Sequence, residues 1–269
     1  MRRRTRPTGM AISESELVRL TADLDEMHRA TLPAMHAAAA GWTEQLRSAA
    51  ADVGRSRTSR RRFLTGGGAT LGALALAACG STGSDKATGK SKPTDRPGNT
   101  PLTGDFAVAA LAAALEHLAV DTYQAGLDAA TAGKLGAVPP AVATFAATAK
   151  AQHSDHAAAW NSVLTNAGKA PVTGVDLTVK NAVVDPAFAQ VTDVTGLAKL
   201  ALGLENVAAA TYLNGIAVME NNNALKIAAS IQPVEMQHAA ILNFVLGQYP
   251  VPDSFAKTDG YRLTSDQIG

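Results

Sequence analysis

Four stretches in the C-terminal two-thirds of the chain have apolar residues every three or four positions. In the first, leucine or valine occupies positions 111, 115, 118 and 120 within an alanine-rich background. This is the spacing of one face of a helix. Glycine and proline separate the stretches, because glycine commonly ends helices and proline suits their first turn. The pattern predicts helices over about 103–132, 139–167, 194–221 and 224–247.

The connections between these predicted helices indicate their topology. Short loops join the first helix to the second and the third to the fourth, so each pair forms an antiparallel hairpin. The link between the hairpins, residues 171–193, contains two prolines and the β-prone fragments VDLTV and AVV. We expect it to be an ordered crossover. Two hairpins joined by one long crossover are typical of all-α four-helix bundles with a single crossover connection.

The chain also repeats itself. Residues 115–126, LEHLAVDTYQAG, recur 89 positions later as 204–215, LENVAAATYLNG. Residues 153–164, HSDHAAAWNSVL, recur 82 positions later as 235–246, EMQHAAILNFVL. A duplicated pair of helical segments predicts a bundle with pseudo-two-fold symmetry.

The polar residues of the repeat have the spacing of metal ligands. A carboxylate-bridged metal pair in a bundle takes one Glu from each of two helices and Glu-x-x-His from the other two, since positions i and i+3 share a face. Segment 235–238 matches the paired motif, segment 153–156 has it with His in place of the Glu, and a lone Glu stands in each copy of the first element. Buried carboxylates on such apolar helices need a compensating cation. The candidate ligands are Glu116, His153, His156, Glu205, Glu235 and His238.

This arrangement resembles the ferritin-like family, particularly exported bacterial members with a twin-arginine leader, over about residues 103–247. The resemblance implies a ferritin-like four-helix bundle with two iron ions, manganese or zinc being the alternatives. It also implies oxygen- or peroxide-dependent redox chemistry. One residue departs from the family pattern, which has Glu where this chain has His153. Three carboxylates and three neutral imidazoles carry −3 against +4 for two divalent ions, so a nitrogen-richer metal pair or a single ion stays open.

Other polar and aromatic residues near the candidate ligands are less informative. His117 points about 100° away from Glu116, which predicts a supporting or surface position. Tyr123 and Tyr212 follow their glutamates by seven residues and share their face. They could donate to a ligand carboxylate or act as redox neighbours, but packing is the preferred interpretation. Trp160 and Phe244 are core candidates.

The N-terminal third has a different composition. Residues 1–79 hold 12 Arg, no Lys and 7 acids, a formal charge of 12 − 7 = +5. The remaining 190 residues hold 12 Lys and Arg against 16 acids, giving −4. Arg60-Arg61, followed by an apolar run over 69–78, resembles a twin-arginine export signal. The sequence LAACG ending this run resembles a lipobox, which implies cleavage before Cys79 and its attachment to lipid.

These features divide the chain into five parts. Residues 1–58 are a leader pre-segment of unknown role, or the product of an upstream start, with a short helix from Ser13 that Pro33 interrupts. His28 and His36 in this part are taken as incidental. Residues 59–79 are the signal, 80–101 a flexible tether rich in Gly, Ser, Thr, Lys and Pro, 102–249 the bundle, and 250–269 a C-terminal tail.

The predicted function is that of an exported, lipid-anchored ferritin-like protein with a carboxylate and histidine metal site. Its expected partners are the twin-arginine export machinery and, through Cys79, the outer face of the cytoplasmic membrane. Nothing in the mildly acidic bundle indicates nucleic-acid binding, and no additional helix indicates a storage cage. The alternative is a non-catalytic surface lipoprotein that uses the bundle as a scaffold, with a degenerate site. A zinc hydrolase is a weaker third interpretation.

Overall fold

The structure is a computed structural model that describes residues 12–57, 102–253 and 257–258. The predicted export signal with Arg60 and Arg61, the lipidation site Cys79 and the tether 80–101 lie outside the described residues. Most of the predicted C-terminal tail also lies outside them.

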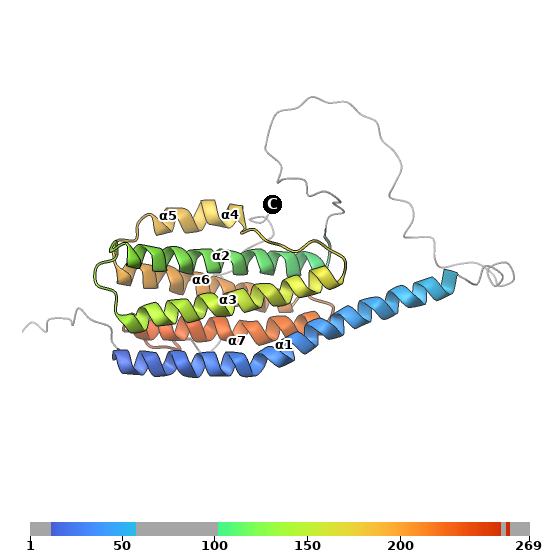
Figure 1. Ribbon diagram of the computed structural model, residues 1–269, viewed down its shortest axis with the longest axis horizontal. Helices are drawn as coiled ribbons and strands as arrows, with labels where there is room; N and C mark the ends of the chain where they lie inside the picture. Colours follow the sequence, from blue (N-terminus) through green and yellow to red (C-terminus); the bar gives the residue numbers. More distant parts are fainter. Residues whose placement is uncertain (1–11, 58–101, 254–256, 259–269) are drawn as a thin grey trace, which may run out of the picture. The chain divides into compact units, whose positions relative to one another are not determined.

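Four long helices form the predicted bundle (Figure 1). The bundle is all-α, and the two expected hairpins are present as α2 with α3 and α6 with α7. The third helix ends at Ile216 rather than at residue 221. The bounds are α2 Asp105–Thr131, α3 Pro140–Asn166, α6 Val194–Ile216 and α7 Asn222–Val245.

Local sequence explains where these helices begin and end. Helix α3 begins with Pro140, which needs no amide partner in the first turn. The Asp193 carboxylate accepts from the Gly196 amide at 2.7 Å, and the Asn221 side chain accepts from two amides at the start of α7. Both are N-caps. Gly133 and Gly168 follow α2 and α3 with positive φ angles of 69° and 71°, the conformation that favours glycine.

Helices α2 and α6 run in opposite directions. The position of a Cβ on Gly126, near the end of α2, lies 3.0 Å from the Leu197 side chain at the start of α6. The corresponding position on Gly215, near the end of α6, lies 3.7 Å from Val108 at the start of α2. This antiparallel arrangement places the two copies of the first repeat element opposite each other.

The crossover is ordered, but it is helical where its β-prone fragments favoured extended structure. It contains α4 Leu177–Val179, the π-helical turn η1 Lys180–Val184 and α5 Asp185–Phe188. Val179 and Val184 are buried against Leu118 of α2. Packing against the bundle therefore overrides the local β-propensity of these valines. Figure 1 shows α4 and α5 alongside α2.

A further helix, α1, spans Glu14–Arg57 and continues through Pro33, so the expected interruption there is wrong. Described residues of α1 up to Gln45 belong to one compact unit with the bundle, whereas α1 from Leu46 onward belongs to another unit. In the first unit, Leu17 and Leu24 of α1 are 0% and 1% exposed, in a cluster with apolar residues of α3 and α7. The sequence prediction of a short helix in a segment of unknown role did not foresee this packing.

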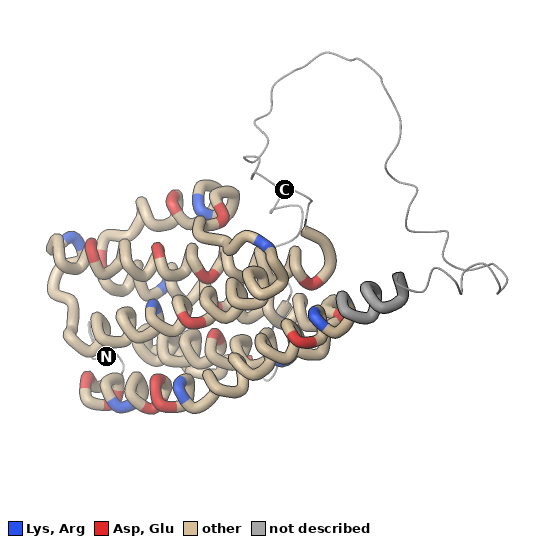
Figure 2. The backbone as a smooth tube through the Cα atoms, turned by 45° about the vertical axis from the view of Figure 1, so that its right-hand side comes forward, with Lys and Arg blue, Asp and Glu red and all other residues tan. Residues whose placement is uncertain are grey.

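Charged residues are sparse on the described helices, and acidic and basic side chains are interspersed (Figure 2). Among the described helices, α2 is long and apolar enough to cross a membrane by composition alone. It nevertheless carries the buried Glu116 and pairs along its length with α3. A core helix of a helical bundle passes the same test of length and composition.

Candidate metal centre

The six candidate ligands converge inside the bundle. Glu116 comes from α2 and Glu205 from α6, while α3 and α7 each supply a residue pair spaced i, i+3. None of the six side chains is more than 4% exposed. The repeat therefore brings together the residues that the sequence singled out, at a depth where water cannot compensate their charges.

These residues form two overlapping groups, each with ligand atoms within 4.8 Å of one another. Glu116 and His156 belong to the first group and Glu205 and His238 to the second, while His153 and Glu235 belong to both. We call the first group half-site A and the second group half-site B. The pseudo-symmetry of the sequence thus becomes two adjacent sites that share two side chains.

His153 occupies the position where the family pattern has a glutamate, and its two ring nitrogens face different half-sites. Nδ1 lies 2.7 Å from Glu116 Oε2, while Nε2 lies 3.3 Å from Glu205 Oε1. An imidazole in this position can donate protons to both glutamates in the absence of metal. A neutral imidazole offers one lone pair, so it can bind an ion in one half-site only.

Two atoms of half-site A indicate that the cluster suits a cation. His156 Nδ1 and Glu235 Oε1 lie 3.1 Å apart, yet both are buried and neither has a hydrogen-bond partner of acceptable geometry. A buried polar atom without a partner is costly. The two atoms contact each other as an ion pair without a hydrogen bond, and they converge like two ligands of one ion. The donor set therefore fits a metal.

Two tyrosines form hydrogen bonds to the outer glutamates, Glu116 and Glu205, each of which belongs to one half-site only. The Tyr123 hydroxyl of α2 donates to Glu205 Oε1 of α6, and the Tyr212 hydroxyl of α6 donates to Glu116 Oε1 of α2. Trp160 is fully buried and donates from Nε1 to the Tyr212 hydroxyl at 2.9 Å. The preference for packing alone was therefore wrong for both tyrosines, which orient the carboxylates by hydrogen bonds.

Glu116 and Glu205 remain ionised although they are buried. Burial by itself would raise the pKa of Glu116, but the charge of His156 and the hydrogen bond and charge of His153 outweigh it and lower the pKa to about 2. Burial is likewise outweighed at Glu205, whose pKa is held well below its usual value by His238 and His153. The imidazoles thus compensate the carboxylates in the metal-free protein.

The histidines show the reciprocal effect. Burial would lower the pKa of His156, but Glu116 and Glu235 raise it to about 9. The pKa of His153 is raised well above its usual value because Glu235 and Glu205 outweigh burial. A cation that binds here must displace imidazole protons.

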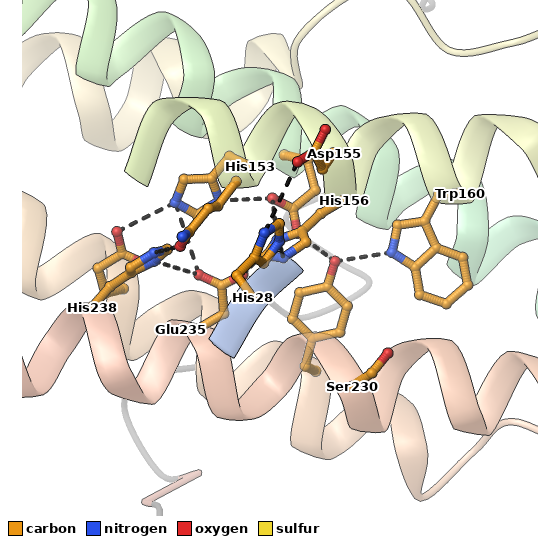
Figure 3. Close-up of polar contacts among 12 residues, drawn as sticks. His28, His153, Asp155, His156, Trp160, Ser230, Glu235 and His238 are labelled. Carbon is orange, nitrogen blue, oxygen red and sulfur yellow. Dashed lines mark hydrogen bonds and ion pairs between the residues drawn. The ribbon is translucent and has the colours of Figure 1, made fainter. Parts of the chain in front are cut away.

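Two residues near the cluster were not singled out from the sequence as site residues. Gln152 is 1% exposed, and its Oε1 accepts from His238 Nε2 at 2.8 Å. His28 of α1 is 4% exposed and lies beside His156, with 3.2 Å between their Nε2 atoms (Figure 3). His28 was taken as incidental, although its position extends the apolar stripe of Leu17 and Leu24 by one further turn.

Other neighbours have separate roles. His117 points away from the cluster, as predicted, and its Nε2 donates to the Val172 carbonyl of the crossover at 2.9 Å. Phe244, expected in the core, is 36% exposed. Asp155, two residues after His153 on α3, is half exposed.

Apolar cavities reach both half-sites. A cavity of about 110 Å³ has Tyr123, His153 and Glu205 among its lining residues and is otherwise almost entirely aliphatic, alanine and glycine. A smaller cavity of about 50 Å³ reaches Glu116, His153 and Tyr212. The smaller cavity lies mainly between α2 and α6, and the larger one is also lined by residues of α3 and α7, so apolar space adjoins the carboxylates of both half-sites.

Comparison with known proteins agrees with this geometry. Residues 104–248, more than half of the chain, match the ferritin-like domain family. Neither a curated protein nor a solved structure matches the chain. The matched residues include all four bundle helices and all six candidate ligands. The chain therefore belongs to the ferritin-like domain family.

Proposed function

We propose that this protein binds two redox-active metal ions, one in each half-site. Iron is the preferred metal for both, and manganese is the alternative. The observation that supports this most strongly is the convergence of His156 Nδ1 and Glu235 Oε1, two buried atoms without hydrogen-bond partners. The second half-site has the same composition, with Glu205 and His238 in place of Glu116 and His156. Carboxylate and imidazole ligands suit both metals, whereas the absence of thiolates disfavours softer ions.

The residues of the cluster would have different roles toward the bound ions. Glu235 would neutralise charge in both half-sites, since its two oxygens lie 3.1 Å from His156 Nδ1 and 3.3 Å from His238 Nδ1. The tyrosine hydroxyls would hold the outer glutamates in place. Bound iron or manganese would supply oxygen- or peroxide-dependent redox chemistry. The aliphatic cavities support this reaction class because dioxygen is small and apolar and would partition into them.

Anaerobic loading with Fe(II) followed by exposure to oxygen tests the proposal. We expect two iron ions per chain by elemental analysis and a near-ultraviolet absorption that grows as dissolved oxygen is consumed. The matched control is Glu220→Gln, which removes a glutamate outside the cluster. A colourless, metal-free protein after loading would refute metal binding. Two bound ions that consume neither oxygen nor peroxide would refute only the redox chemistry.

A second candidate function is that of a scaffold without chemistry. It is favoured by His153, which donates to Glu116 at 2.7 Å and can stabilise the carboxylates without metal. This alternative predicts no bound transition metal and a melting temperature that a chelator does not change. The redox protein should instead lose stability when its metal is removed.

Export and lipid anchoring are a separate part of the proposal and rest on the sequence. The paired Arg60-Arg61, the apolar run and Cys79 stand at the spacing of a twin-arginine lipoprotein signal. Cleavage before Cys79 would cut the peptide connection between α1 and the bundle. Mass spectrometry of the protein from membranes of a producing cell tests this, since a diacylated N-terminal Cys79 is expected. An unlipidated chain that retains residue 28 would refute it.

A further inference from the structure

Each half-site has one histidine that the other does not share, His156 in half-site A and His238 in half-site B, and we call these the outer histidines. Each has a partner on the ring nitrogen that faces away from the carboxylates. His238 presents Nδ1 to Glu205 and Glu235 at 3.4 and 3.3 Å, and its Nε2 donates to Gln152 Oε1 at 2.8 Å. Such a bond fixes the tautomer in which Nδ1 carries the free lone pair. Half-site B is therefore completed by a residue of the bundle itself.

Half-site A cannot be completed in the same way. Gln152 immediately precedes His153, and the 82-residue offset of the repeat places Val234 at the corresponding position before Glu235. Val234 is 5% exposed and has no side-chain acceptor. The duplicated sequence thus provides a partner for one outer histidine and leaves the other without a counterpart.

Helix α1 supplies the missing partner. His28 Nε2 lies 3.2 Å from His156 Nε2, while His156 Nδ1 faces Glu235 and Glu116 at 3.1 and 3.6 Å. Asp155 Oδ2 lies 3.9 Å from His28 Nδ1. A carboxylate on that side favours the tautomer with its proton on Nδ1, which leaves Nε2 of His28 as the acceptor. Figure 3 shows His28 beside His156 and Asp155.

The position of His28 along α1 is determined by packing. Leu17, Thr21 and Leu24 precede it at intervals of three and four residues and are 0%, 3% and 1% exposed. This buried stripe directs the next residue of the series, His28, at the bundle. Its ring is 5.2 Å from that of His156, with an interplanar angle of 57°.

We infer that His28 is a positioning residue of the metal centre and that α1 completes half-site A as a fifth helix. The inference rests on the proposed function, since it assigns His28 a role toward a metal bound by His156. By accepting from His156 Nε2, His28 keeps Nδ1 directed at the ion. It also requires α1 to be present when the centre is loaded, that is, before the proposed cleavage ahead of Cys79.

Titration of the full chain with Co(II), followed by visible absorption and calorimetry, tests the inference without an activity assay. His28→Ala should lower the affinity for one of the two ions about 10- to 100-fold, the usual effect of losing such a hydrogen-bond partner, and leave the affinity for the other unchanged. His28→Gln retains a side-chain acceptor and should restore most of the affinity. His36→Ala is the matched control, because His36 is exposed on the same helix.

Gln152→Leu provides the complementary variant, which should weaken the ion that His28→Ala leaves intact. His28→Ala with both ions at wild-type affinity would overturn the inference. Equal weakening of both ions, without rescue by His28→Gln, would also overturn it, because that pattern indicates general loss of packing. A wild-type chain that binds no ion would refute the proposed function instead, so the two failures are distinguishable.

Discussion

Replacing Glu235 should remove both metal ions, whereas replacing either outer glutamate should remove one. Glu235 is 0% exposed, and each of its oxygens faces the outer histidine of a different half-site. Glu235→Gln retains the size of the side chain but removes the charge that both half-sites share. Glu116→Gln and Glu205→Gln each alter a single half-site.

The expected magnitude follows from binding linkage. An ion present at a hundred times its Kd stabilises the folded protein by about 2.7 kcal/mol, so two ions contribute about 5 kcal/mol. For a domain of this size, 1 kcal/mol shifts the Tm by about 2–4 °C. We therefore expect metal to raise the Tm of the wild type by about 10–20 °C. Each outer variant should show about half that rise, and Glu235→Gln close to none.

Thermal melting followed by circular dichroism, with Mn(II) or with a chelator, measures these shifts. The melt in chelator reports the metal-free stability of each variant and separates loss of metal from loss of fold. A full metal-induced shift in Glu235→Gln would refute the shared role of this residue. Complete loss of both ions in Glu116→Gln would refute the division into half-sites.

Three further predictions concern the residues around the shared position. His153→Glu should lower the metal-free Tm, because a fourth buried carboxylate replaces a compensating imidazole, and should tighten binding of the second ion in calorimetry; weaker binding of both ions would contradict this. Tyr212→Phe removes the donor to Glu116 and should weaken binding of one ion about 10- to 150-fold, since a hydrogen bond to a charged group contributes about 1.5–3 kcal/mol; Tyr123→Phe should weaken binding of the other ion, and an effect on both ions from one variant would oppose the reciprocal arrangement. The folded pKa of His156, about 9, lies above its unfolded value of 6.5, so its contribution to metal-free stability is present below pH 6.5 and lost as the pH rises through 9; urea unfolding at pH 6 and pH 9 should show this loss in the wild type and less of it in His156→Gln.

The sequence was sufficient to predict the bundle and the six candidate ligands because both depend on local regularities. Residues at i and i+3 share a helix face in any bundle, and the repeat identified which faces point inward. Glu116 and Glu205 could therefore be paired across the fold before any contact was known. The short loops and the long crossover then determined which helices form hairpins.

The contacts that the sequence did not reveal depend on packing between helices. Tyr123 reaches Glu205 only because α2 and α6 are antiparallel and directly opposed, and Gln152 reaches His238 across the α3–α7 contact. His28 was missed for a different reason. It lies before an apparent export signal, and its segment was treated as a leader. The recurrence of apolar residues before it was the signal that could have placed it in the structure.

Anomalous scattering from crystals of the Fe(II)-loaded full chain tests directly whether each half-site binds a metal ion. We expect two peaks at the iron edge, one near Glu116 and His156 and the other near Glu205 and His238, with His153 and Glu235 between them. No peak in the cluster after loading with iron, manganese or zinc would contradict this expectation.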